Sequence, residues 1–195
     1  MRTALAHRTH MGDNEDIASL VAATVEEFGG VDIVVNNAAN PLAQPIGAMT
    51  PEAMAKSWEV NFRGPVLLVQ EALEHLRASD HPAVLNVTTA GVYTTGASVA
   101  LYVAAKSAMT AVTRSMAAEL AGQGIRVNAL APGSVATQMM LNNPEEFQQY
   151  AIESQLIKRL ADPLEMLYPA LFLCSDASSF MTGHTLVVDG GMTVH

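Results

Sequence analysis

Apolar residues alternate along the chain between short continuous runs and longer stretches with helical spacing. Short runs rich in β-branched residues are typical of strands buried on both faces of a sheet. They predict four strands, at residues 31–36, 83–88 and 125–130 and, with its turn, at 184–191. Apolar positions spaced three and four residues apart predict helices between these strands. The predicted helices span residues 14–28, 51–77, 99–120, 144–160 and 163–175.

Residue types that are common at helix ends support these limits. Asp13 is placed to cap the first helix, because its carboxylate can accept hydrogen bonds from the free backbone N–H groups of the first turn. Thr50 and Pro51 have the residue types preferred at the N-cap and the first helical position. Gly122 and Gly124 close the helix predicted over residues 99–120.

Strands that alternate with helices of this length predict an α/β fold with a parallel sheet and right-handed crossovers. We therefore expect a single domain over residues 1–195, with a Rossmann-like doubly wound parallel sheet in three α/β/α layers. Sheets of this kind bind ligands at the carboxyl ends of their strands. Residues suited to contact a ligand follow three of the predicted strands there: Asn37, Thr88, Thr89, Pro132 and Gly133.

Composition and charge exclude several classes of protein. Half of the residues are hydrophobic and 15% are charged, which excludes a disordered chain. The formal net charge is −9, with 10 basic against 19 acidic residues, so nucleic acid is not expected as a partner. The single cysteine, Cys174, allows no intrachain disulfide, and the six histidines lack the spacing of metal ligands. No apolar run has the length of a membrane span or a signal-peptide core, so we expect a cytoplasmic protein without a membrane partner.

A tyrosine and a lysine are placed for acid–base chemistry on one helix. Tyr102 and Lys106 are four residues apart, so they lie on the same helical face. A free phenol has a pKa of about 10. A neighbouring ammonium favours the phenolate and is expected to lower the pKa of Tyr102. The phenol would then exchange a proton with an alcohol or a carbonyl. Alone, this pair is a weak signal, because most such pairs are a surface tyrosine beside a surface lysine.

Two further positions strengthen the hypothesis of a catalytic site. The hydroxyl of Thr89 is able to donate a hydrogen bond to a substrate oxygen and hold it near the phenol. Pro65 has no N–H, and its ring clashes with the carbonyl four residues earlier, which belongs to Asn61. The sequence thus predicts a kinked helix whose free Asn61 carbonyl binds a water between Lys106 and solvent. The alternative is that the Gly64-Pro65 pair simply bends the helix around the core.

Six motifs in order resemble the classical short-chain dehydrogenase/reductase family, and together they cover the chain from about residue 10 to its end. The motifs are NNAA at 36–39, N-x-x-G at 61–64, NVTT at 86–89, YVAAK at 102–106, IRVNALAPGSVAT at 125–137 and GHTLVVDGG at 183–191. The resemblance implies an oxidoreductase that transfers a hydride between NAD or NADP and a carbonyl or secondary alcohol. It also implies a small-molecule substrate and assembly as a homodimer or homotetramer.

The resemblance assigns roles to individual residues of this sequence. Tyr102 would be the general acid/base, Lys106 would lower its pKa and bind the nicotinamide ribose, Thr89 would orient the substrate, and Asn61 would belong to the proton relay. The implied cofactor-binding residues are Asn37, Ala38, Ala39, Thr88, Tyr102, Lys106, Pro132, Gly133, Val135 and Thr137. Among them, Asn37 and Ala38 would line the adenosine side, and Pro132, Gly133, Val135 and Thr137 would meet the nicotinamide.

Three single residues depart from the family pattern. Thr89 stands where serine is usual, which keeps the hydroxyl but stiffens the side chain and narrows the pocket. Ala39 replaces a glycine, which is tolerable if its φ is negative. His10 stands where the family commonly has an aspartate near the adenine.

The largest departure is at the front of the chain. The family opens with a strand, a glycine-rich turn and a helix that binds the pyrophosphate. No such G-x-x-x-G-x-G stretch occurs here, and residues 3–9 resemble the family's third strand. The first two strands and their helices would then be absent. We expect an unpaired apolar edge on the strand at 31–36 and poor affinity for a dinucleotide.

Two histories fit this N-terminally truncated pattern. Either the complete protein starts upstream of Met1, or the chain is a shortened descendant that no longer catalyses. The retained set of catalytic residues favours the first. The rival hypothesis for function is a non-catalytic fragment that binds no cofactor and serves only as a fold or assembly unit.

Overall fold

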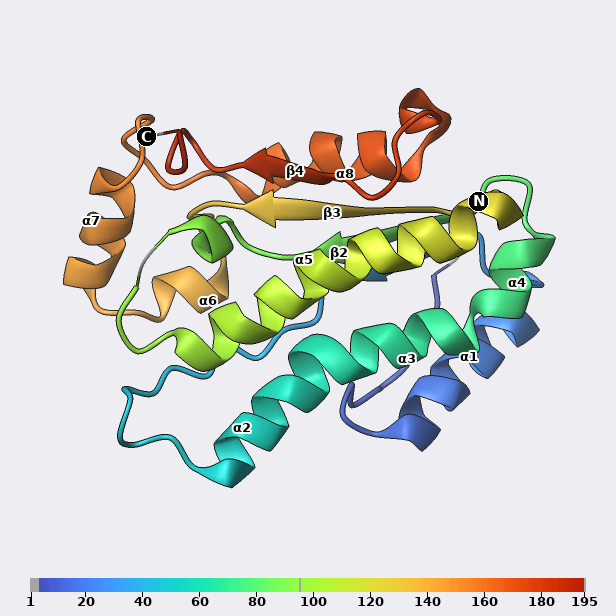
Figure 1. Cartoon of the computed structure of the whole chain (residues 1–195), viewed down its shortest axis with the longest axis horizontal. Coiled ribbons are helices and arrows are strands. Elements are labelled where there is room, and N and C mark those ends of the chain that lie inside the picture. Colours follow the sequence, from blue (N-terminus) through green and yellow to red (C-terminus); the bar gives the residue numbers. More distant parts are fainter. Residues whose placement is uncertain (1–3, 95, 195) are drawn as a thin grey trace.

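Four parallel strands form the centre of the protein. The structure, a computed structural model, describes residues 4–94 and 96–194. The strands are β1 (Ile33–Asn36), β2 (Ala83–Val87), β3 (Arg126–Pro132) and β4 (Thr185–Val188), and they lie side by side in the order β1-β2-β3-β4 (Figure 1). Asn36 pairs with Asn86, and Asn86 with Ala129, so the carboxyl ends of three strands reach the same edge.

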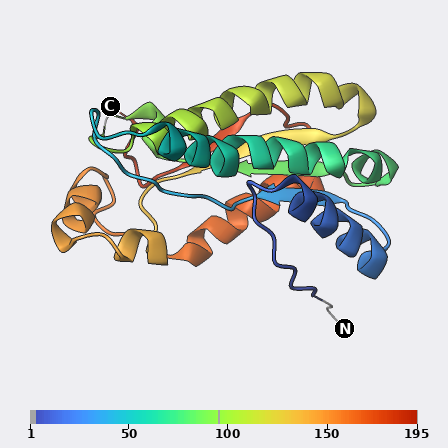
Figure 2. The same cartoon turned by 90° about the horizontal axis from the view of Figure 1, so that it is seen from below.

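Helices cover both faces of this sheet. The α-helices are α1 (Asn14–Phe28), α2 (Pro51–Trp58), α3 (Gly64–Glu71), α4 (Leu73–Ala78), α5 (Ala100–Leu120), α6 (Gln138–Leu141), α7 (Glu145–Glu153) and α8 (Leu167–Cys174). Short 3-10 turns lie at Ala90–Tyr93, Ala121–Gln123, Pro163–Met166 and Asp176–Ser178. Helices α3 and α5 lie on one side of the sheet and α8 on the other (Figure 2). The expected three-layer α/β/α arrangement is confirmed.

The predicted helix caps are present. The Asp13 carboxylate accepts hydrogen bonds from the backbone N–H groups of Glu15 and Asp16 at the start of α1. Thr50 Oγ1 accepts one from the N–H of Ala53, and Pro51 is the first residue of α2. These contacts satisfy donors that the first helical turn cannot pair internally.

The long helix predicted over residues 51–77 is interrupted. A π-helical segment, Glu59–Arg63, separates α2 from α3, and α4 begins after Ala72. Proline cannot donate to the carbonyl four residues earlier, and a π-helical turn places one extra residue at such a point. The prediction of a disturbed helix at Asn61 is therefore confirmed, although as a π-helical segment rather than a simple kink.

The predicted helix at 144–160 is too long. Helix α7 ends at Glu153, because the N–H groups of Leu156 and Ile157 both donate to the Gly190 carbonyl, each over 2.9 Å. This tertiary contact replaces the helical hydrogen bonds that the sequence pattern suggested. The next helix begins as a 3-10 turn capped by Asp162 and becomes α-helical only at Leu167.

Apolar side chains fill the space on both sides of the sheet. The larger cluster lies towards α1, α3 and α5, and its buried members are Val21, Val34, Val69, Ala72, Leu76, Val84, Ala117, Leu120, Ile125 and Val127. A smaller cluster of Leu85, Leu130 and Leu173 lies towards α8. This packing fixes α5 and the ends of β2 and β3, which carry most of the candidate site.

Residues 4–10 form no strand, and the outer edge of β1 has no neighbouring strand in the sheet. Residues 4–10 adopt no regular structure, so the strand suggested at 3–9 does not form over residues 4–9, and residue 3 lies outside the described part. Strand β1 is the last in the sheet, and its Ile33 and Val35 are 42% and 48% exposed. The expectation of an apolar sheet edge is confirmed.

Within residues 4–94 and 96–194, none of the helices combines the length and the apolar character that crossing a bilayer requires.

Candidate active site

The site residues meet at the carboxyl edge of the sheet. Connecting segments follow β1 at residues 37–50, β2 at 88–94 and 96–99, which include the 3-10 turn Ala90–Tyr93, and β3 at 133–137. The first turns of α5, which carry Tyr102 and Lys106, lie at the same end of the molecule as the strand tips (Figure 1). Parallel strands bring these segments together although they are far apart in the sequence.

Lys106 is buried against β2, beside a half-buried Tyr102. Lys106 is 2% exposed, and its Nζ donates a hydrogen bond to the Val87 carbonyl over 2.7 Å. The same ammonium lies 5.9 Å from the centre of the Tyr102 ring. The pair is therefore not a surface tyrosine beside a surface lysine, which was the simpler explanation of the sequence pattern.

The acidity of this pair differs from the sequence-based expectation. Burial raises the pKa of the Tyr102 phenol to about 12, and burial lowers the pKa of the Lys106 ammonium to about 8. The expected lowering of the phenol pKa by its neighbour is thus wrong for this structure. The physical reason is that loss of hydration disfavours the charged form of both groups, and this effect exceeds their mutual influence.

The two threonines after β2 have different partners. Thr89 Oγ1 accepts a hydrogen bond from the Gly91 N–H over 3.1 Å, which leaves its own hydroxyl hydrogen for another acceptor. Thr88 is 3% exposed, and both its N–H and its hydroxyl donate to the Leu130 carbonyl. Thr88 therefore joins β2 to β3, and its predicted contact with a cofactor stays a prediction.

Asn61 clamps the loop that follows β1. Its side chain is fully buried and pairs with the backbone of Asn40, accepting from the N–H over 2.8 Å and donating to the carbonyl over 2.9 Å. A further bond runs from Asn61 Nδ2 to the Ser57 carbonyl over 3.0 Å. Sequence analysis considered the Asn61 carbonyl and missed this role of the amide side chain.

The loop after β1 exposes two of the predicted cofactor-binding residues. Asn37 and Ala38 are exposed, and the Asn37 N–H donates to the Val35 carbonyl over 3.1 Å. Among the described residues other than glycine, Ser98 is the only one with a positive φ, 64°. The backbone of Ala39 is therefore compatible with a side chain, as predicted.

The turn after β3 passes very close to the end of β4. The Gly133 N–H donates to the Val188 carbonyl, and a Cβ at position 133 would lie 2.6 Å from the Asp189 Cα. Val135 forms a bridge with Ala161, and Thr137 is exposed. Pro132 and Gly133 thus fix the course of the segment that was predicted to meet the nicotinamide.

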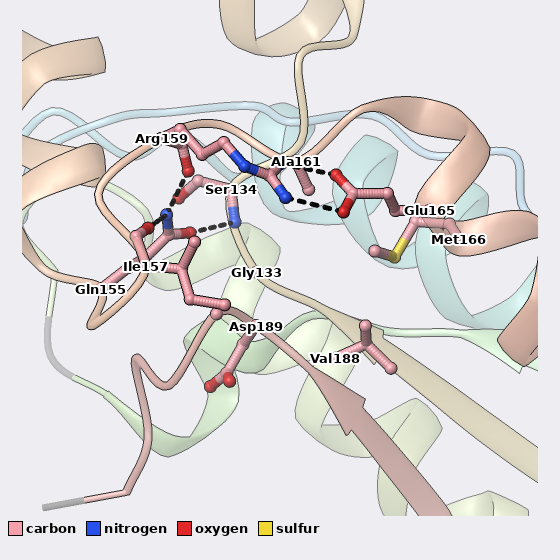
Figure 3. A pocket seen from close by; sticks show the side chains of 11 residues that line it. Gly133, Ser134, Gln155, Ile157, Arg159, Ala161, Glu165, Met166, Val188 and Asp189 are labelled. Carbon is pink, nitrogen blue, oxygen red and sulfur yellow. Dashed lines mark hydrogen bonds and ion pairs between the residues drawn. The ribbon is translucent and has the colours of Figure 1, made fainter.

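A cavity of about 110 Å³ adjoins this turn (Figure 3). Gln155, which is 3% exposed, accepts from the Ser134 N–H and donates to the Arg159 carbonyl. The Arg159 guanidinium binds both oxygens of Glu165, over 2.6 and 2.8 Å, and this contact lowers the pKa of the Glu165 carboxyl to about 2. Sequence analysis missed this structural cluster, because its members are joined only by the fold.

Two hollows in the described part of the protein are not lined by Tyr102 or Thr89. The first is the cavity beside Gly133, and the second, of about 350 Å³, lies between α2 and α5. Tyr102 and Thr89 line neither of them. A substrate pocket shared by these two residues therefore stays a prediction.

Comparison with known proteins identifies the family. The family model described as enoyl-(acyl carrier protein) reductase matches residues 2–193. A short-chain dehydrogenase/reductase of Aspergillus oryzae, astE, is 35% identical over 192 residues, which cover 95% of this chain and 74% of that protein. The chain belongs to the short-chain dehydrogenase/reductase family. The resemblance stated from six sequence motifs is thereby confirmed.

The chain is also similar to a dehydrogenase and to a solved structure that contains NADPH. The cis-4-hydroxycyclohexanecarboxylate dehydrogenase of Sinomonas cyclohexanicum is 37% identical over 192 residues, covering 97% of this chain and 77% of that enzyme. The crystal structure of a blue fluorescent protein from a metagenomic library, in complex with NADPH, superposes with a TM-score of 0.89 and 27% identity. It covers 94% of this chain and 74% of its own. This chain thus spans about three quarters of the length of its relatives.

Proposed function

We propose that the protein is an oxidoreductase that transfers a hydride between NAD or NADP and a small carbonyl or secondary alcohol, with Tyr102 as the general acid/base. The observation that carries the proposal is the buried Lys106 ammonium, which lies 5.9 Å from the centre of the half-buried Tyr102 ring at the carboxyl edge of the sheet. Membership of an oxidoreductase family and the NADPH complex of a structural relative support it. Assembly as a homodimer or homotetramer and a cytoplasmic location are predictions of the same proposal.

The residues present fit one half of a dinucleotide. Lys106 donates one hydrogen bond to Val87, and an ammonium has three donors, so it can also bind ribose hydroxyls. The Gly133 turn offers backbone that a flat nicotinamide can approach closely, whereas the exposed Asn37 and Ala38 belong to the predicted adenosine side. The 195 residues contain no glycine-rich turn to hold the pyrophosphate. The nicotinamide end is therefore assigned to this chain, with Thr137 and Val135 beside it.

The cofactor would supply or accept the hydride, and the chain's residues would handle the proton. In the direction of reduction, the Tyr102 hydroxyl would donate its proton to the carbonyl oxygen of the substrate. The Tyr102 phenol, whose pKa burial raises to about 12, is protonated at neutral pH, which is the form that can donate a proton. Thr89 would donate a hydrogen bond to the same oxygen, and a water at Asn61 would return the proton to Tyr102.

Turnover of the Tyr102→Phe variant tests the proposal. cis-4-Hydroxycyclohexanecarboxylate is a suitable first probe, because a relative is named for its oxidation. Formation of NADH or NADPH is followed by absorbance, together with a panel of other cyclic secondary alcohols. Loss of the general base is expected to reduce kcat about 10²–10⁴-fold. Tyr93→Phe, at a half-exposed tyrosine outside α5, is the matched control. Unchanged turnover in Tyr102→Phe rejects the mechanism.

A non-catalytic fold unit is the second candidate, because the sequence lacks the glycine-rich turn and β1 has an exposed apolar edge. It predicts that the 195-residue protein binds neither NADH nor NADPH. Titration of each nucleotide, followed by its fluorescence, separates the two candidates. Saturable binding that Lys106→Ala weakens supports the oxidoreductase, and the absence of binding supports the fold unit.

A further inference from the structure

Three buried polar side chains form a hydrogen-bonded chain from β1 to α5. Asn36 Nδ2 donates to Asn86 Oδ1 over 2.9 Å, and Asn86 Nδ2 donates to Thr113 Oγ1 over 2.9 Å. Thr113 Oγ1 donates in turn to the Met109 carbonyl over 2.8 Å. Asn36 is 5% exposed, and the other two are fully buried. The bond between Asn86 and Thr113 therefore ties α5 to β2 in the interior of the protein.

This bond lies next to the contact that holds Lys106. Val87 directly follows Asn86 on β2, and its carbonyl accepts the hydrogen bond from Lys106 Nζ. Thr113 follows Lys106 by seven residues on α5, which is about two helical turns, so both side chains lie on the same face. The two bonds thus fix neighbouring points of the same helix–strand interface.

Stability alone does not explain an amide at position 86. Its neighbours Val84 and Leu85 are apolar and 2% and 1% exposed, so this strand accommodates apolar side chains. A paired buried amide adds about 1 kcal/mol, whereas an unpaired one costs roughly 1–3 kcal/mol. A hydrogen bond requires a narrow range of distances and angles, whereas an apolar contact does not. The Asn86–Thr113 pair therefore fixes the alignment of α5 on β2 more strictly than an apolar contact would.

We propose that Asn86 and Thr113 are positioning residues that hold α5 at the place on β2 where the Lys106 ammonium reaches the Val87 carbonyl. The inference rests on the proposed function, in which Lys106 and Tyr102 form the reacting pair. Neither Asn86 nor Thr113 touches substrate or cofactor. Without the Thr113 hydroxyl, the Asn86 amide faces an apolar group, and α5 shifts until the amide reaches water. Lys106 then leaves its carbonyl partner and becomes hydrated.

NMR titration of Lys106 in the full chain tests this proposal. The protein has three lysines, so 13C- and 15N-labelled lysine gives three assignable side-chain signals. In wild-type protein, the pKa of Lys106 is expected at about 8 because of burial. In Thr113→Val, it is expected to rise by about one pH unit or more, towards the ordinary lysine value of about 10.4.

Two variants serve as controls. Thr113→Ser keeps the hydroxyl and is expected to restore the wild-type titration of Lys106. Thr110→Val removes a buried hydroxyl from the same helix, but that hydroxyl donates only to the Lys106 carbonyl within α5, over 3.0 Å. Because this hydroxyl does not join α5 to β2, Lys106 in Thr110→Val is expected to titrate as it does in wild-type protein.

A folded Thr113→Val variant whose Lys106 titrates as in wild-type overturns the proposal, even if the variant is less stable. If Thr113→Val does not fold, hydrogen exchange of wild-type protein decides. The Asn86 side-chain amide must then be protected as firmly as the backbone N–H groups of β2, and free exchange overturns the proposal. Neither measurement needs turnover, so both are decided independently of the effect of Tyr102→Phe.

Discussion

Replacement of Lys106 by methionine should stabilise the protein while removing a group assigned to its chemistry. Burial lowers the pKa of Lys106 from 10.5 to about 8, because the ammonium is poorly hydrated beside β2. This difference between the two pKa values corresponds to about 3 kcal/mol of folding free energy. Methionine has an unbranched side chain of similar length and carries no charge. Below pH 8 the Lys106→Met variant should therefore be more stable than wild-type protein by up to about 3 kcal/mol.

The lowered pKa of Lys106 determines how the free energy of unfolding changes with pH. Between pH 8 and 10.5, unfolded Lys106 retains a proton that the folded protein has released. The unfolded state thus binds more protons, and the free energy of unfolding of wild-type protein rises with pH across this window. The variant lacks this contribution. The stability of wild-type relative to Lys106→Met should increase by about 3 kcal/mol between pH 7 and 11.

Urea denaturation at a series of pH values provides the assay. The single tryptophan, Trp58, stacks on Phe62 with ring centres 4.3 Å apart, so its fluorescence reports loss of the fold. Lys56→Met, at an exposed lysine, is the matched control and should show no such dependence. If the stability difference between wild-type and Lys106→Met stays constant from pH 7 to 11, burial does not lower the pKa of the Lys106 ammonium, and the reasoning is refuted.

Two further predictions follow from the packing and acidity of the site. Gly64→Ala should lower the free energy of unfolding by about 1–3 kcal/mol in urea denaturation, because its Cβ would overlap the Met11 carbonyl. Gly122→Ala, whose Cβ would meet no atom within 4 Å, should change it by less than about 0.5 kcal/mol; equal effects at the two positions would contradict the packing argument. Spectrophotometric titration at alkaline pH should show a phenol that ionises near pH 12 and disappears in Tyr102→Phe, and identical curves for the two proteins would contradict the burial of this phenol.

The sequence predicted the elements that depend on local pattern. The first helix, with Asp13 as its cap, and the strands at 83–88 and 125–130 were recognisable because hydrophobic spacing and capping chemistry are local. Tyr102 and Lys106 were recognisable for the same reason, since they are four residues apart on one helix. The burial of Lys106 depends on the fold and was not predictable from this spacing.

Features that depend on distant partners were not predictable in this way. The end of α7 is set by Gly190, whose carbonyl takes the N–H groups of Leu156 and Ile157. The clamp between Asn61 and Asn40 likewise joins segments 21 residues apart. The sign of the Tyr102 pKa change was wrong because sequence spacing reveals a neighbouring charge but not the loss of water around both groups.

Isotope transfer tests the central claim most directly. A secondary alcohol that the protein oxidises is deuterated at its carbinol carbon, and the nicotinamide product is analysed by mass spectrometry. The account predicts that one deuterium per turnover reaches the nicotinamide and that Tyr102→Phe suppresses this transfer together with turnover. Deuterium that is lost to water, or that reaches the nicotinamide at an undiminished rate without the Tyr102 hydroxyl, would contradict it.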